Sequence, residues 1–107
     1  ARGEDLLTGY SKIVRMGPGE IYAGGTTLAE REVPRIGIGV IIERAKEEDT
    51  EWSFYDTWQK FNENTDRVSS KKYLDVEGDY YYRVRCIHSA GNDMGSSFTD
   101  GVYIEEP

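Results

Sequence analysis

The stretch GDYYYRVRCIHSAG, residues 78–91, decides the fold because its side chains alternate with the period of two that a β-strand has. One side is mostly apolar and consists of Tyr80, Tyr82, Val84 and Cys86. The other side is aromatic and charged and consists of Tyr81, Arg83, Arg85 and Ile87. Such a strand is typical of an antiparallel sheet that is packed on one face and open to water on the other. We therefore expect the first side to face the core.

Further strands are predicted elsewhere in the chain. Residues 36–42 follow Pro34 with an alternating row of Ile and Val, and residues 52–61 alternate with aromatic rings on both sides. Weaker patterns predict strands over 10–16, over 21–28 with a bend or bulge at Gly24-Gly25, over 67–76 and over 98–104. Turns or loops are expected where glycine or polar residues gather, at 17–19, 46–51, 62–66 and 91–95.

No helical period or internal repeat interrupts this pattern, and 107 residues suffice for one domain with one core. The fold class predicted is therefore all-β. We expect a single antiparallel β-sandwich domain over residues 1–107, with about seven strands. Residues 1–5 are expected to fray.

The spacing Tyr80-x-Tyr82-x-Val84-x-Cys86, followed by residues 88–91, resembles the penultimate strand and last hairpin of a fibronectin type III or immunoglobulin-like sandwich. The resemblance implies that Tyr80 makes the corner contact known from such domains. Two features depart from the pattern. Glu77-Gly78 stands in place of Pro-Gly before the corner, and the single cysteine rules out an immunoglobulin disulfide.

A second resemblance covers the chain from about Ile36 onward. Residues 81–85, 88–90 and 99–104 are similar to a group of small secreted proteins of Gram-positive Firmicutes whose function is unassigned. It implies no activity, cofactor or ligand. The β-rich pattern with many tyrosines and hydroxyl residues favours a secreted, extracellular protein whose signal peptide has been removed. Ala1 fits such a processed N-terminus or a tag remnant, and we favour the first.

The charge excludes some classes of partner. Thirteen basic and 20 acidic residues give a net charge of −7, which opposes binding to nucleic acid and to anionic membrane surfaces. No apolar run approaches the roughly 18 residues that span a bilayer. No phosphate-binding loop follows the glycines at 17–19 or 24–25, so neither a nucleotide nor another cofactor is expected.

Catalysis has few candidate residues. His88 is the single histidine, so a triad must include it, and Cys86 lies on the same side of the strand. The simpler interpretation places Cys86 in the core and lets His88 hydrogen-bond to the following hairpin. Paired carboxylates for glycoside hydrolysis depend on geometry, so a small hydrolase stays open as a third alternative. The chain is expected to be no enzyme.

Metal binding has even fewer candidates. One histidine and one cysteine cannot complete a zinc site without carboxylates. Calcium is the one metal open to the chain, through the carboxylates of residues 47–51. Their spacing lacks the turn glycine of a calcium-binding loop, so a solvated loop without a metal is expected.

The leading hypothesis for function is a non-catalytic extracellular module that binds a glycan, a peptide or an envelope protein. It rests on the many rings, 8 Tyr, 2 Trp and 3 Phe, because aromatic side chains give rigid contact area with little loss of entropy. The candidate ligand-binding residues are Trp52, Tyr55, Trp58, Tyr81, Arg83 and Arg85.

This hypothesis expects adjacent exposed rings beside Tyr81, with Tyr55 or a tryptophan as the neighbour. Alternatively, a tryptophan fills the core and Tyr81 only packs across strands. The second hypothesis is a structural or self-assembling envelope component, in which unpaired strand edges or the aromatic face join copies of the domain or cover a larger envelope component.

Overall fold

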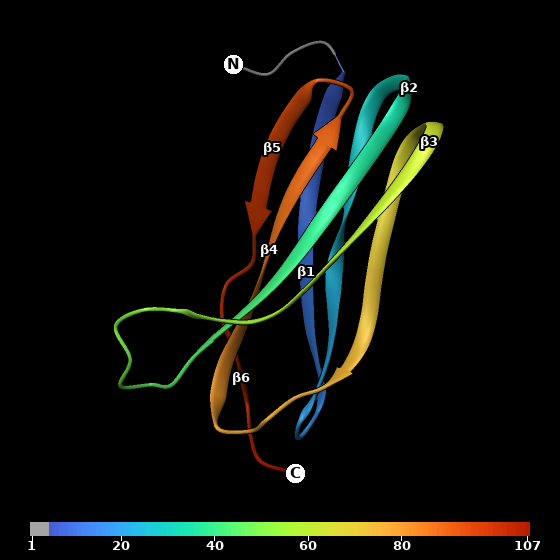
Figure 1. Cartoon of the computed structure of the whole chain (residues 1–107). Coiled ribbons are helices and arrows are strands. Elements are labelled where there is room, and N and C mark those ends of the chain that lie inside the picture. The colour runs from blue at the N-terminus through green and yellow to red at the C-terminus, as the bar shows by residue number, and fades with distance from the viewer. Residues whose placement is uncertain (1–4) are drawn as a thin grey trace.

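The computed structural model describes residues 5–107, which form six strands and no helix (Figure 1). The strands are β1 (Leu6–Gly17), β2 (Glu20–Ala45), β3 (Ser53–Asp75), β4 (Tyr80–Ala90), β5 (Asp93–Phe98) and β6 (Val102–Ile104). Every pair is antiparallel, which confirms the predicted all-β, sandwich-like fold. Residues 5–107 contain no helix of the length and apolar character needed to cross a membrane.

The sheet is continuous and folds over on itself into two layers (Figure 1). The first layer holds β1, residues 20–28 of β2 and residues 67–75 of β3. The second layer holds residues 36–45 of β2, residues 53–63 of β3, and β4, β5 and β6. Because β2 and β3 are long and pass through both layers, six strands replace the expected seven or so.

The two long strands bend together at one end of the molecule (Figure 1). The register of their pairing shifts between Leu28 and Val33, and Asn64 adopts the left-handed conformation with φ of 55°. The Asn62 side chain donates a hydrogen bond to the carbonyl of Arg67 at 3.2 Å, which ties the two halves of β3 together. The turn predicted at 62–66 is thus a bend within a strand.

The interruption predicted at Gly24-Gly25 is absent, because β2 continues through both glycines and pairs there with β1 and β3. Gly25 faces the interior, where a Cβ atom would lie 2.4 Å from the Tyr10 carbonyl oxygen and 2.7 Å from Cys86 Sγ. The absence of a side chain at Gly25 therefore lets the two layers pack closely at this point.

The core lies between the layers and is built from the inward sides of β2 and β4. Tyr82, Val84 and Cys86 are fully buried, as the alternation of residues 80–87 predicts. They meet a row from β2 whose members are also buried: Ile36, Ile38, Val40 and Ile42. Each fully buried side chain of this size contributes roughly 1.5–3 kcal/mol of hydrophobic stabilisation.

The corner contact expected for Tyr80 is made by Tyr82. The Tyr82 hydroxyl donates a hydrogen bond to the backbone carbonyl of Glu77, five residues upstream. Tyr80 has the same parity but only partial burial, and its ring lies 4.1 Å from the Arg44 guanidinium. Tyr82, which is nearer the middle of the strand, therefore both fills the core with its ring and binds the Glu77 carbonyl with its hydroxyl.

The C-terminal part also differs from the expectation. The strand predicted over 98–104 is divided, because residues 99–101 lie between β5 and β6. Thr99 pairs with Val84 through its backbone N–H and its hydroxyl. Of the N-terminal residues expected to fray, 1–4 lie outside the described part, and the backbone N–H of Asp5 donates to the Asp93 carboxylate at 2.7 Å.

Candidate functional site

The outer face of the second layer is the candidate functional site. Residues paired across an antiparallel sheet point to the same side, so the register defines this face. Its rows cross the sheet from β3 through β2 and β4 to β5 or β6. The side chains that matter below are Phe54, Thr57, Gln59 and Phe61 from β3, Ile41 and Glu43 from β2, Tyr81, Arg83, Arg85 and Ile87 from β4, Met94 and Phe98 from β5, and Tyr103 from β6.

Large apolar side chains on this face are open to solvent. The exposed fractions are 64% for Phe54, 67% for Met94 and 71% for Phe98. Side chains exposed to this extent contribute little to the packing of the core. Large apolar side chains that stay exposed on one face indicate an interaction surface.

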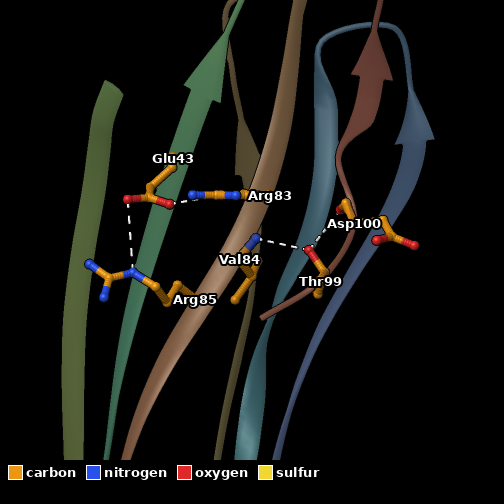
Figure 2. A network of polar contacts seen from close by, with 6 residues as sticks. All are labelled: Glu43, Arg83, Val84, Arg85, Thr99 and Asp100. Atoms are coloured by element: carbon orange, nitrogen blue, oxygen red, sulfur yellow. Dashed lines mark hydrogen bonds and ion pairs between the residues drawn. The ribbon is translucent and has the colours of Figure 1, made fainter. Parts of the chain in front are cut away.

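Two arginines on the outer face share one carboxylate (Figure 2). Arg83 Nε donates to Glu43 Oε1 at 2.8 Å, while Arg85 Nε lies 3.8 Å from Glu43 Oε2. The Arg83 guanidinium also lies 4.4 Å from the centre of the Trp52 ring. The cluster carries one net positive charge in a chain whose net charge is −7.

Trp52, Tyr81 and Tyr103 gather at the end of the outer face where β6 lies. The rings of Tyr81 and Tyr103 have centroids 5.1 Å apart at an interplanar angle of 61°, an edge-to-face arrangement. An open hollow of about 300 Å³ is lined by Trp52, Tyr81 and the loop of residues 45–51. Tyr81 therefore has Tyr103 as its ring neighbour and shares the hollow with Trp52, and both Tyr81 and Trp52 are half-buried. That these rings bind a ligand stays a prediction.

Two of the candidate residues lie on the opposite side of the sheet. The Tyr55 ring packs edge-on against buried Tyr82 at 5.4 Å. Trp58 donates its indole N–H to Ser70 Oγ at 3.0 Å and lies under the Lys72 ammonium. Trp52, Tyr81, Arg83 and Arg85 thus share the outer face, whereas Tyr55 and Trp58 border the core.

A β-bulge explains this division. Ile42 pairs with Asp56, whereas the next residue of β2, Glu43, pairs with Phe54. The extra residue, Tyr55, reverses the alternation of β3, so that Phe54 joins the outer face with Thr57 and the residues beyond it. Strict alternation puts Phe54 on the same side as Trp52 and Trp58, and Phe54 is not among the candidates predicted from the sequence.

The outer face also has a hollow over Gly39. The Phe61 ring covers neighbouring Gly37 so closely that a Cβ atom there would lie 2.4 Å from Phe61 Cε1. Over Gly39 nothing comes closer to a Cβ position than Ile87 Cβ at 3.9 Å. The resulting hollow, about 410 Å³, is bordered by Ile41, Thr57 and Gln59.

His88 belongs to a buried chain of hydroxyl groups rather than to a dyad with Cys86. Thr27 donates its hydroxyl proton to the Gly37 carbonyl and so accepts from His88 Nδ1 at 2.7 Å. His88 Nε2 then accepts from Ser97 at 2.7 Å, and Ser97 Oγ lies 2.6 Å from Ser11 Oγ. The chain joins β1, β2, β4 and β5, and it includes the bond from His88 to the last hairpin that the sequence predicts.

The environment favours uncharged forms of both residues. Burial lowers the pKa of His88, whose partners are neutral hydroxyls, and no carboxylate contacts its ring among the described residues. Burial also raises the pKa of the Cys86 thiol, which is fully enclosed. The Ser97–His88 contact therefore fits a structural tie better than nucleophilic catalysis.

The acidic loop is closed by its own contacts. Lys46 N–H donates to the Asp49 carboxylate at 2.8 Å, and Asp49 N–H donates to the Lys46 carbonyl at 3.0 Å. Within residues 5–107, no three His, Cys, Asp or Glu side chains converge as metal ligands. That the loop binds no calcium stays a prediction.

Comparison with known proteins shows the fold and no family. No family model matches the chain, and no curated protein matches it either. Among solved structures, the chain is similar to the solution structure of CsgH from R. palustris, with a TM-score of 0.51 and 16% sequence identity. The match covers 87% of this chain and 92% of CsgH. The two chains share the all-β, sandwich-like architecture over nearly their whole length.

Proposed function

We propose that this protein is a non-enzymatic component of an assembly system at the cell envelope, and that it binds an extended stretch of another protein on the outer face of its second layer. The observation that carries the proposal is the exposure of Phe54, Met94 and Phe98 on that one face. Aromatic and methionine side chains are enriched where proteins bind one another. The role requires export of the chain.

The shape of the outer face supports an extended partner. Gly39 leaves the middle of the face low, whereas the Phe61 ring of β3 covers Gly37 in the row on one side and Phe98 of β5 stands exposed in the row on the other. An extended segment bound over Gly39 would lie between these rings. Alternate side chains of that segment would point to the face, in keeping with the period of two.

The structural neighbour supports an assembly role rather than catalysis. CsgH is a curli assembly protein, and the present chain has its fold at low sequence identity. This favours the structural hypothesis of the sequence analysis over a small hydrolase. We extend to the present chain only the general role in assembly, with the partner binding through the outer face.

The experiment is a polymerisation assay with purified curli subunit, followed by thioflavin fluorescence. We expect equimolar protein to lengthen the lag phase. The variants Phe54→Ser and Phe98→Ser should lose this effect, whereas Tyr73→Ser, which removes an exposed ring from the first layer, should keep it. Each change should alter stability by less than about 0.5 kcal/mol. An unchanged lag with wild-type protein, or equal activity of all variants, would overturn the proposal.

The cluster of Trp52, Tyr81 and Tyr103 favours a second candidate function, binding of a glycan at the envelope. Sugar faces stack on aromatic rings, and the hollow of about 300 Å³ beside Trp52 and Tyr81 has room for a sugar ring. A glycan array probed with wild-type protein and with Trp52→Ala tests it. Binding that is lost in Trp52→Ala and kept in Phe98→Ser would favour this candidate, and a blank array would remove it.

A further inference from the structure

The charge cluster on the outer face leaves Arg85 with unsatisfied capacity for an anion. Glu43 is its one carboxylate contact among residues 5–107, at 3.8 Å, and the same carboxylate is bound more closely by Arg83. The Glu43 side chain is 15% exposed, whereas that of Arg85 is 44% exposed. A guanidinium group has five N–H donors. Arg85 therefore combines one long carboxylate contact with a side chain that is open enough to bind a further acceptor.

Arg85 stands between two apolar side chains. The register pairs it with Ile41 on β2 and with Phe98 on β5. A carboxylate that reaches Arg85 would lie beside an exposed ring and an aliphatic side chain. Partial exclusion of water by such neighbours strengthens a charge-assisted hydrogen bond.

The hollow over Gly39 is the next row of the same face. Gly39 pairs with Ile87, and Ile87 is two residues from Arg85 on β4. Residues i and i+2 of a strand are separated by roughly 6.5–7 Å. The Gly39 row and the Arg85 row are therefore separated by the distance between two side chains on one side of a strand bound along the face.

We propose that the outer face binds a protein segment in which an apolar residue and an Asp or Glu are two positions apart. The apolar side chain fills the hollow over Gly39, and the carboxylate accepts hydrogen bonds from Arg85. This inference rests on the proposed function, because it names the chemistry of the partner that the outer face would hold. The positive cluster within an otherwise acidic chain supplies the charge complementarity.

The test uses two capped synthetic peptides that contain either Val-Thr-Glu or Val-Thr-Gln in an otherwise identical six-residue context. Binding is measured by calorimetry with the whole protein. We expect the Glu peptide to bind roughly tenfold more tightly, the effect of about 1.4 kcal/mol that a partly exposed charge-assisted contact gives. Equal affinity for the two peptides would overturn the proposal, as would binding to neither.

Variants of the cluster give effects of opposite sign. Arg85→Gln should abolish the preference for the Glu peptide, while Glu43→Gln should increase it by releasing both guanidinium groups. Arg67→Gln makes the same change of charge at an exposed position in the first layer and should leave the preference unchanged. Thermal melts of each variant check that it folds. A preference that survives Arg85→Gln would contradict the proposal.

The hollow has its own variant. Gly39→Val should weaken binding of both peptides by a similar factor, because the added side chain occupies the space meant for the partner valine. Nothing closer than 3.9 Å opposes a Cβ at this position, so the variant should fold. Unchanged binding by Gly39→Val would overturn the two-site arrangement. The polymerisation assay tests the proposed function separately from this inference. If wild-type protein lengthens the lag phase, Phe98→Ser does not, and neither peptide is preferred, the proposed function stands and this inference is wrong.

Discussion

Gly25 faces Cys86 across the interior with no room for a methyl group between them. A Cβ atom at position 25 would lie 2.7 Å from Cys86 Sγ and 2.4 Å from the Tyr10 carbonyl oxygen. The backbone of β1 and the core of the second layer both limit this space. The distance between the two layers is therefore set at this glycine.

Replacement of Gly25 by alanine should lower the free energy of unfolding by about 1–3 kcal/mol, the cost of forcing extra atoms into a packed core. Chemical denaturation measures the change. Gly39→Ala is the matched control on the same strand, because a Cβ there meets its nearest neighbour at 3.9 Å. Equal stability of the two variants would contradict the close approach described for Gly25.

The corner contact predicts a difference between two neighbouring tyrosines. Tyr82→Phe removes the hydroxyl that donates to the Glu77 carbonyl and should cost about 1 kcal/mol of stability. Tyr80→Phe removes a hydroxyl that takes no part in this contact and should cost less than half as much. Urea denaturation of both variants distinguishes them, and a larger loss for Tyr80→Phe would restore the assignment made from sequence.

His88 predicts a loss of stability on mild acidification. Burial lowers its pKa in the folded state below the value of about 6.5 that it has in the unfolded chain. Between these two values the unfolded state binds more protons, so the free energy of unfolding falls as the pH drops below about 6.5. His88→Gln should remove this dependence above the range where carboxylates titrate.

The control for that experiment is Ser97→Ala, which loses one hydrogen bond but keeps the histidine. It should be less stable at every pH and still show the fall below pH 6.5 or so. Thermal melts in a series of buffers provide the measurement. A wild-type protein with a flat profile between pH 7 and the carboxylate range would show that burial does not govern this histidine.

Cys86 should react slowly with a thiol reagent in the folded protein, because its side chain is fully buried and its pKa is raised. Ser96→Cys places a second thiol at an exposed position of β5. Ellman's reagent should then show one fast and one slow thiol, and denaturant should make both fast. Two fast thiols in native buffer would revive a reactive Cys86.

Regular alternation made part of the fold predictable. The sides of β4 follow from residues 80–87 because each inward position is occupied by a residue that packs and each outward one by a residue that tolerates water. The pattern also placed Arg83 and Arg85 together on one face. Such a strand has no glycine, proline or bulge in its middle to change its direction.

The course of β3 was less predictable because its features depend on pairing. The bulge at Tyr55 has no local sequence signal, since the extra residue is defined by the pairing of Glu43 with Phe54. The polar residues around Asn64 predict a loop, whereas in the structure Asn64 lies in a bend of β3 that follows the bend of β2 beside it. The exposed rings of Phe54 and Phe98 could therefore be assigned to one surface only after pairing was known.

β2 and β3 pass through both layers, so each layer contains only part of these two strands. Ile21 in the first layer and Ile38 in the second are carried by the same strand, and residues of β1 and β5 nearly 90 positions apart in sequence meet at the opposite seam. We therefore expect the two layers to unfold together. Slowly exchanging amides in the two layers should thus share one opening rate, and a partner held on the outer face would stabilise the remote layer as much as its own.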